Sequence, residues 1–205
     1  MKTNKDIFEN IYKDKLWHKD NSPLSGPGSS LEYTEKLRNN LPTILAKFNV
    51  KTLLDAGCGD LTWMSLLLTD GNIKYIGVDV VETLIQSHKQ KFPQIEFHVK
   101  DITVDSLPSA DMMLCRDCLF HMSDKDIFNA LRNFLNSNIP YIFTTSHVTD
   151  RLNYDIQTGD FRILNLLNHP FNLPTPLYSI DDTYERHPRR NMVIWSREQI
   201  EKALQ

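Results

Sequence analysis

Several features that would indicate a membrane, secreted or nucleic-acid-binding protein are missing from this sequence. No apolar run is long enough to span a bilayer, and Met1 to Asp6 leads into polar chain, so we expect neither membrane insertion nor a signal peptide. The net charge is -3, without the basic excess that grips phosphate backbones. We therefore expect no nucleic-acid partner, although Arg186, Arg189 and Arg190 could form a local basic patch.

Cysteine is scarce. The chain has 3 cysteines, an odd number that argues against a disulfide framework and fits a reducing cytoplasm. Cys115 and Cys118 form a C-x-x-C motif with His121 three residues further on. A zinc site would need a fourth ligand, and a redox motif would need a thioredoxin context. We expect no resident metal, and we expect Cys115 to end a buried strand as a small hydrophobe.

The segment 53–60, which says most about the function of this chain, also lacks a third glycine. Residues 53–60 read Leu-Leu-Asp-Ala-Gly-Cys-Gly-Asp, an apolar strand followed by a turn that exposes backbone to an adenosine-containing ligand. A dinucleotide fingerprint would place its third glycine where Thr62 stands. Asp55 precedes the turn and would repel a pyrophosphate, whereas it suits an ammonium group. S-adenosylmethionine has an ammonium and no phosphate, which favours it over NAD.

What is present after residue 50 is a regular alternation of strands and helices. The expected strands are 52–56, 75–79, 95–99, 112–115 and 141–145, and the expected helices are 61–69, 82–91 and one that Ser123 caps. Antiparallel strands at 178–180 and 192–195 and a short helix capped by Ser196 would complete the chain. This pattern predicts a Rossmann-like, doubly wound α/β fold with a mostly parallel sheet and helices on both faces.

One domain of 205 residues is expected, in four parts. Residues 1–50 form a helical N-terminal lid, 51–146 the cofactor-binding core, 147–190 a substrate-side insertion after the fifth strand, and 191–205 the final strand and helix. The insertion is rich in proline and too apolar for a disordered linker.

Four motifs, each after its own strand, make the resemblance to a family explicit. They are Asp55-Ala-Gly-Cys-Gly, Tyr75-Ile-Gly-Val-Asp79, Lys100-Asp101-Ile102 and Leu114-Cys-Arg-Asp-Cys-Leu-Phe-His121. Over residues 50–146 the chain resembles class I S-adenosylmethionine-dependent methyltransferases. The flanking segments 25–29 and 165–176 look similar to a bacterial subgroup that methylates surface polysaccharides and small molecules.

The resemblance implies a set of cofactor-binding residues. Gly57 and Gly59 would lie under the methionine and adenosine, and Asp79 would take both ribose hydroxyls. Asp101 would bind the adenine amino group, with Ile102 beside the ring. The other implied positions are Asp55, Ala56, Cys58, Asp60, Trp63, Val80, Cys115, Arg116, Ser25, Gly26 and Arg38.

The turn-rich stretch 25–30 has two interpretations. It could be a connector between two helical stretches. It could instead close over the methionine end of the cofactor, with Tyr33 or Arg38 supplying a hydrogen bond or a carboxylate partner.

Methyl transfer to a hydroxyl needs a base near the ends of the fourth and fifth strands. His121 is the leading candidate, and its alternative role is to cap or pack the following helix. Asp117 could orient His121, act as the base itself, or hold a backbone amide. His147, at the end of the fifth strand, is the second candidate base, and His18 is a distant third.

We therefore expect methyl transfer from S-adenosylmethionine, which leaves S-adenosylhomocysteine, to a hydroxyl of a sugar or small metabolite. Two alternatives stay open: a catalytically inactive cofactor-binding sensor or partner protein, and a methyltransferase acting on nitrogen or carboxylate.

Overall fold

The computed structural model describes residues 2–68, 73–185 and 187–205. Its sheet strands are β1 (Thr52–Ala56), β2 (Lys74–Asp79), β3 (Glu96–Val99), β4 (Met112–Cys115), β5 (Tyr141–His147), β6 (Tyr178–Asp181) and β7 (Arg190–Ser196). The α-helices are α1 (Asn4–Lys13), α2 (Glu35–Lys47), α3 (Glu82–Lys91), α4 (Asp124–Asn136) and α5 (Arg197–Ala203). Short 3-10 turns are η1 (Pro27–Ser29), η2 (Met64–Leu67) and η3 (Leu119–His121).

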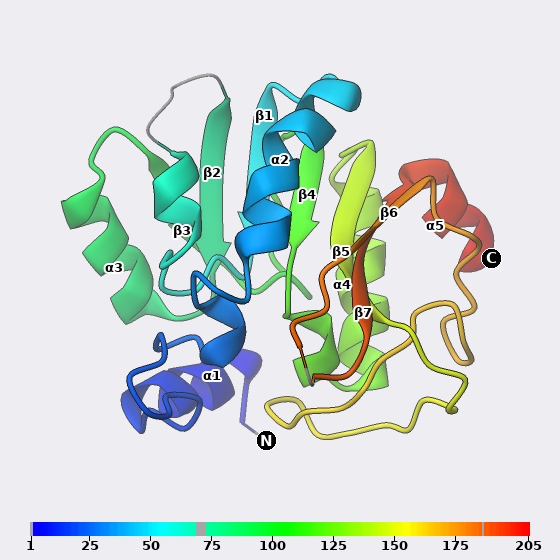
Figure 1. The fold of residues 1–205 in the computed structure, drawn as a ribbon, viewed down its shortest axis with the longest axis horizontal. Coiled ribbons are helices and arrows are strands. Elements are labelled where there is room, and N and C mark those ends of the chain that lie inside the picture. Colours follow the sequence, from blue (N-terminus) through cyan, green and yellow to red (C-terminus); the bar gives the residue numbers. More distant parts are fainter. Residues whose placement is uncertain (1, 69–72, 186) are drawn as a thin grey trace.

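The strands form one sheet in the order β3-β2-β1-β4-β5-β7-β6 (Figure 1). The strands from β1 to β5 pair in parallel, and β7 pairs antiparallel with both β5 and β6. The expected doubly wound α/β fold is confirmed, including the antiparallel finish. The order reverses direction between β1 and β4, and in such sheets a ligand crevice lies outside the carboxyl ends of the strands at that point.

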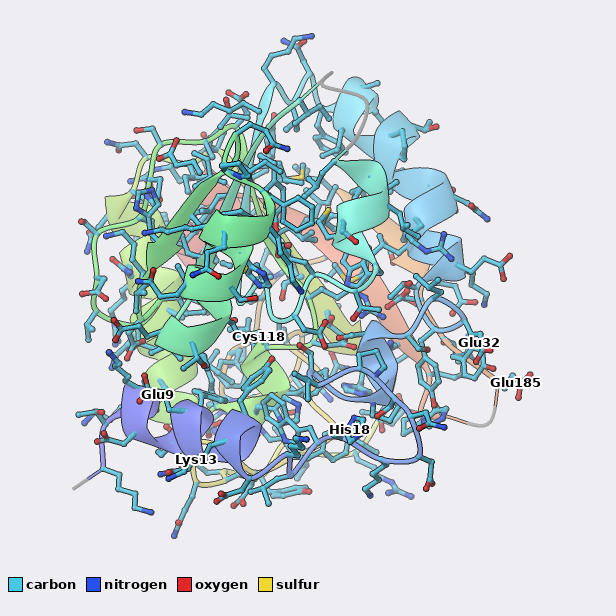
Figure 2. The ribbon with its side chains drawn as sticks, turned by 90° about the vertical axis from the view of Figure 1, so that its left-hand side faces the viewer. Glu9, Lys13, His18, Glu32, Cys118 and Glu185 are labelled. Carbon is cyan, nitrogen blue, oxygen red and sulfur yellow. The ribbon has the colours of Figure 1, made fainter. Side chains whose placement is uncertain are left out.

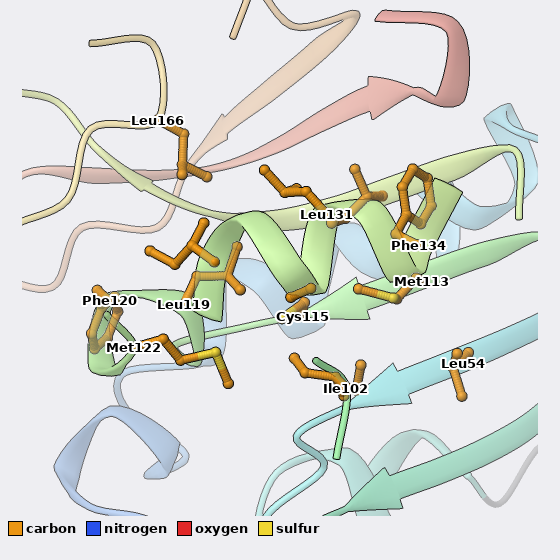
Figure 3. Packing of buried hydrophobic residues seen from close by; sticks show 14 of the residues in the cluster. Leu54, Ile102, Met113, Cys115, Leu119, Phe120, Met122, Leu131, Phe134 and Leu166 are labelled. Carbon is orange, nitrogen blue, oxygen red and sulfur yellow. The ribbon is translucent and has the colours of Figure 1, made fainter. Parts of the chain in front are cut away.

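Each face of the sheet carries its own apolar core. Side chains alternate along a strand, so Leu53 faces α2 and η2 whereas Leu54 faces the opposite core, which α4 and α5 cover. Figure 3 shows this second core, where Met113 and Cys115 of β4 lie close to Leu131 and Phe134 of α4. A strand buried on both faces is apolar at every position, as the sequence of β4 is.

Most element bounds agree with the sequence prediction. The side chains of Ser123 and Ser196 cap α4 and α5 as expected. The helix predicted at 61–69 is wrong for the part described, because only the 3-10 turn η2 forms there and Thr69 lies outside the described residues. Leu61 has φ +58°, and the Asp60 carboxylate accepts from the backbone N–H of Thr62, so the chain starts with a tight turn instead of a helix.

Two segments cover the carboxyl ends of the parallel strands. In Figure 1, α1 crosses below these ends, and the insertion between β5 and β6 runs beside it. Within the described residues, no helix combines the length and apolar character needed to cross a bilayer.

Candidate functional site

A pocket of about 860 Å³, partly open to solvent, lies at the switch point between β1 and β4. The lining comes from the strand ends, from the N-terminal segment and from the turn before α4. The residues are Asn4, Phe8, Tyr12, Trp17, Ser25, Ser29, Asp55, Gly57, Cys58, Gly59, Trp63, Asp79, Val80, Lys100, Asp101, Ile102, Arg116, Asp117, Cys118, His121 and Met122.

The glycine loop after β1 needs both of its glycines. Gly57 and Gly59 have φ +80° and +59°, which is left-handed backbone that side chains disfavour. A Cβ on Gly57 would lie 3.1 Å from the Cys118 Sγ, and one on Gly59 would lie 2.5 Å from the Ser25 Oγ. The loop therefore presents bare backbone between two neighbouring segments of the pocket.

Asp79, at the end of β2, faces this loop. Its two carboxylate oxygens accept from the backbone N–H of Gly59 (3.0 Å) and of Val81 (2.9 Å). Burial raises the pKa of Asp79, although these two hydrogen bonds oppose the rise. The next strand end contributes Asp101, whose Oδ1 accepts from the backbone N–H of Thr103 at 2.9 Å. The expected acidic residues thus converge on one pocket.

Asp55 is the acidic group nearest the start of the loop. It is buried, and the Tyr75 hydroxyl donates to its Oδ2 at 2.7 Å. Burial raises the pKa of Asp55 to about 7, and the hydrogen bond from Tyr75 limits that rise. A cationic ligand would stabilise the ionised form of this buried carboxyl, because the cation replaces the hydration that the carboxylate has lost.

The N-terminal segment forms the opposite wall of the pocket. Figure 2 shows α1, with Glu9 and Lys13 labelled, below Cys118 and the strand ends. The Tyr12 hydroxyl and the Ser25 Oγ lie 2.7 Å apart, and the Ser25 Oγ accepts from the backbone N–H of Asp60 at 2.9 Å. The stretch 25–30 is therefore hydrogen-bonded to the glycine loop.

Five implied cofactor residues do not line the pocket. Ala56 and Cys115 are fully buried in the core, and Asp60 acts through its bonds to Ser25 and Thr62. Gly26 instead packs against the Trp17 side chain, where a Cβ would lie at 3.5 Å. Further away, Arg38 donates to the Leu31 carbonyl and to the Thr34 hydroxyl, and Tyr33 stacks on Tyr184.

Asp117 belongs to a buried ionic network. Its Oδ2 accepts from Arg190 at 2.8 Å and lies 3.2 Å from Arg116, and its Oδ1 accepts from the Thr145 hydroxyl at 2.9 Å. Arg116 also binds Asp182 through two nitrogens, at 3.1 and 3.0 Å. Burial alone would raise the pKa of Asp117, but the two arginines outweigh burial and lower it. Asp117 is thus an ionised anchor that is poorly suited to take up a proton.

The same network holds the N-terminal segment. The Arg116 Nη1 donates to the Gly28 carbonyl at 2.7 Å, and a Cβ on Gly28 would lie 2.8 Å from the Asp117 Oδ2. Glycine is therefore the residue that lets this loop approach the carboxylate. This contact explains the glycine at position 28 of the Ser-Gly-Pro-Gly-Ser stretch.

His121 is the candidate base that faces the pocket. Its Nδ1 lies 2.8 Å from the Asp160 carbonyl, which can only accept, so Nδ1 carries the proton and Nε2 keeps its lone pair. The ring stacks on Trp17 with centroids 4.5 Å apart. Burial lowers the pKa of His121, so the neutral ring that can accept a proton prevails at neutral pH.

The other two histidines considered as bases, His147 and His18, do not line the pocket. His147 is buried outside the pocket lining, where its Nδ1 accepts from the backbone N–H of Leu164 at 3.2 Å and its ring packs on Phe120. His18 is exposed, and its Nδ1 lies 2.6 Å from the Ser22 carbonyl. Neither position supports the role of base that the sequence allowed.

The C-x-x-C motif divides between the core and the pocket. Cys115 ends a buried strand as expected, whereas Cys118 lines the pocket. The hydrogen bond with Cys115, together with burial, raises the pKa of the Cys118 thiol well above its ordinary value. Across the described ranges, no group of three or more His, Cys, Asp or Glu residues is placed to hold a metal ion.

Comparison with known proteins agrees with this geometry. Residues 53–138 match the family model described as "Methyltransferase domain". A stretch of 109 residues is 29% identical to "Putative methyltransferase 235L" of Invertebrate iridescent virus 6 and covers 48% of this chain. The chain spans only about 40% of the length of that relative.

Solved methyltransferase structures share the whole fold at low sequence identity. Magnesium protoporphyrin IX methyltransferase from Synechocystis PCC 6803 superposes with a TM-score of 0.65 at 12% identity, over 95% of this chain and 99% of that one. The 1,6-didemethyltoxoflavin-N1-methyltransferase from Burkholderia thailandensis gives 0.65 at 16% identity, over 94% and 86%. N-methyltransferase NodS from Bradyrhizobium japonicum WM9 gives 0.58 at 14% identity, over 80% and 96%.

Proposed function

We propose that this chain transfers the methyl group of S-adenosylmethionine to a hydroxyl of a sugar or another small metabolite, with His121 as general base. In this reaction the bond between the methyl carbon and sulfur breaks, a carbon–oxygen bond forms, and the hydroxyl proton passes to the His121 Nε2. S-adenosylhomocysteine is the second product. The observation that carries the proposal is that a histidine with a free Nε2 lines the same pocket as the glycine loop.

The cofactor assignment is supported by charge as well as by the domain match. Asp55, Asp79, Asp101 and Asp117 line the pocket, against Lys100 and Arg116. An acidic lining suits a ligand with a sulfonium and an ammonium and disfavours the pyrophosphate of NAD. Two of the solved neighbours, with bound S-adenosylhomocysteine in the Synechocystis and Burkholderia enzymes, carry the same cofactor class.

The assignment of His121 is supported by elimination within the pocket. Asp117 is bound by two arginines, and His147 lies outside the lining. His121 alone among these three candidates combines a neutral ring, a free nitrogen and a place in the pocket lining. A base with a pKa near or below neutrality can accept a proton during the reaction and release it to solvent afterwards.

The insertion places one exposed aromatic residue beside the proposed base. Within the insertion, the Asn153 side chain donates to the Asn165 and His169 carbonyls. Arg162 of the insertion is fully buried. Phe161 is 54% exposed beside the His121 ring, where it could stack on a sugar face.

Ligand binding and turnover test the proposal in two steps. Thermal shifts with S-adenosylhomocysteine and with NAD should show stabilisation by the first and none by the second; the reverse result would refute the cofactor assignment. Release of S-adenosylhomocysteine would then be followed with pools of sugars and small metabolites that carry hydroxyl, amino or carboxyl groups. Turnover with amines alone would overturn the hydroxyl assignment, and tight cofactor binding with no turnover in any pool would favour a sensor.

A further inference from the structure

Three consecutive backbone carbonyls next to the pocket each accept a hydrogen bond from the insertion. Gly159 donates its backbone N–H to the His121 carbonyl at 2.8 Å, and Arg162 donates its own to the Phe120 carbonyl at 3.2 Å. The Arg162 Nη2 donates to the Met122 carbonyl at 2.8 Å. The turn that carries His121 is therefore fixed by a segment nearly forty residues further along the chain.

We call this segment, residues 158–162, the clamp. At its start, the Thr158 hydroxyl accepts from the backbone N–H of Ser123 at 3.0 Å and donates to Asp126 at 2.5 Å. In its middle, the Asp160 carbonyl accepts from the His121 Nδ1. The clamp thus touches the turn on both sides of His121 as well as the imidazole itself.

Arg162 anchors the clamp from inside the protein. Its side chain is fully buried, and its Nη1 lies 2.6 Å from both the Asp124 carboxylate and the Tyr154 carbonyl. The guanidinium also lies over the Phe171 ring, 5.9 Å from its centroid. A buried guanidinium is tolerated when an anion and planar hydrogen bonds match it, and its fork then has little freedom. One rigid group therefore joins α4, the turn at 120–122 and the insertion.

We propose that Arg162 is a positioning residue, which through the clamp holds the Asp160 carbonyl where it keeps the proton on the His121 Nδ1 and leaves Nε2 free for the acceptor. This role rests on the proposed function of His121. Without the Asp160 carbonyl at that place, a neutral imidazole distributes its proton over both nitrogens. The Nε2–H form cannot accept the hydroxyl proton, so loss of the anchor lowers turnover without removing any group that contacts the cofactor.

Two variants of Arg162 test the proposal. Arg162→Lys keeps the charge and loses the planar fork, and Arg162→Met combined with Asp124→Asn removes both buried charges. Arg132→Met is the matched control, because Arg132 lies on the exposed side of α4 over Phe128 and does not contact the clamp. The tautomer of His121 is read from two-bond nitrogen–proton correlations in protein labelled with ¹⁵N-histidine, with His121→Gln for assignment.

We expect the Nδ1–H form in the wild type and in Arg132→Met, and a mixture of both forms in the two Arg162 variants. Affinity for S-adenosylhomocysteine should stay within about twofold, while kcat with an identified acceptor falls about tenfold or more. An unchanged Nδ1–H signal in the Arg162 variants, or an Nε2–H signal in the wild type, would overturn the proposal.

A milder variant covers the case in which the Arg162 variants do not fold. Thr158→Val removes the hydroxyl that ties the clamp to Ser123 and Asp126 and leaves the buried charges in place. A shift toward the Nε2–H form in this variant supports the proposal, and an unaltered tautomer refutes it. The His121 tautomer can be measured without an acceptor substrate. Absence of turnover in the wild type would therefore count against the proposed function. The tautomer measurement would still decide the positioning role of Arg162.

Discussion

The two sides of the pocket are built in different ways. The cofactor side consists of the ends of β1 and β2 and the short loops that follow β1, β2 and β3, so Asp55, Asp79 and Asp101 reach the pocket because of where each strand ends. The proposed acceptor side depends on contacts between segments far apart in the chain. His121 is oriented by Asp160 and Trp17, and Asp117 is bound by Arg190. The cofactor side is therefore specified by local sequence, and the acceptor side by the tertiary structure.

Replacement of His121 should have the largest effect on activity. For His121→Gln we expect kcat to fall by about 10²–10⁴-fold, the range for loss of a general base, because Gln cannot accept the hydroxyl proton. Affinity for S-adenosylhomocysteine, measured by calorimetry, should be nearly unchanged, since the cofactor is held by the other side. His147→Gln is the control and should retain most of its turnover. Equal losses in both variants would contradict the division between the two sides.

Replacement of Asp55 should change the pH dependence of stability. The pKa of Asp55 rises from 3.8 to about 7 on folding because of burial, so the folded chain binds this proton more tightly than the unfolded chain. The free energy of unfolding therefore carries a contribution that falls between about pH 4 and pH 7, on the order of 4 kcal/mol in total.

Asp55→Asn should remove that contribution, so its stability relative to the wild type increases as the pH rises from 5 to 8. Urea unfolding across this range measures the difference. Tyr75→Phe removes the hydrogen bond that limits the pKa of Asp55 and should extend the fall to higher pH. A constant difference between Asp55→Asn and the wild type would show that burial does not control this carboxyl.

Addition of a methyl group to the glycine loop should lower the free energy of unfolding by less than the Asp55 contribution. It should also weaken cofactor binding. Gly59→Ala places a side chain in left-handed backbone, which costs about 1–2 kcal/mol, and brings its Cβ to 2.5 Å from the Ser25 Oγ. We expect a lower melting temperature and weaker S-adenosylhomocysteine binding. Adding Ser25→Ala should restore part of the stability by removing the clashing oxygen; no recovery would mean that backbone strain is the whole effect.

The smallest effect is expected at the ion pair that links the two helices flanking the cofactor side. Lys5 of α1 lies 2.7 Å from Glu82 of α3, and both side chains are about half exposed. Exposed pairs contribute little because water and salt screen them. Lys5→Gln should therefore leave the melting temperature and cofactor affinity within experimental error. A clear loss of affinity would mean that this pair helps to hold α1 over the pocket.

The sequence predicted the locally specified elements better than the parts that depend on contacts between distant segments. The helix at 82–91 and the strand at 112–115 were predicted with their observed bounds, because a proline stop and an apolar run act within a few residues. The predicted helix at 61–69 failed because Leu61 turns into left-handed backbone. The amphipathic pattern of α1 indicates a helix but not that Phe8 and Tyr12 line a pocket instead of only filling a core.

The roles of Asp117 and His147 could not be predicted for a related reason. The strand-end position of Asp117 suggested a base, but its charge is neutralised by an arginine more than seventy residues away. His147 follows the pattern of a strand end too, yet β5 continues through it and pairs it with Arg190 of β7. Long-range partners of this kind leave no periodic signal in the sequence.

The place of β7 in the sheet has a consequence for synthesis on the ribosome. It is the last strand in the chain, yet it lies between β5 and β6, and it supplies the arginine that pairs with Asp117. A nascent chain that ends before residue 190 can pair β1 to β5 but leaves the edge of β5 open and Asp117 without that partner. The glycine loop and the strands from β1 to β5 are therefore translated before the strand whose arginine pairs with Asp117.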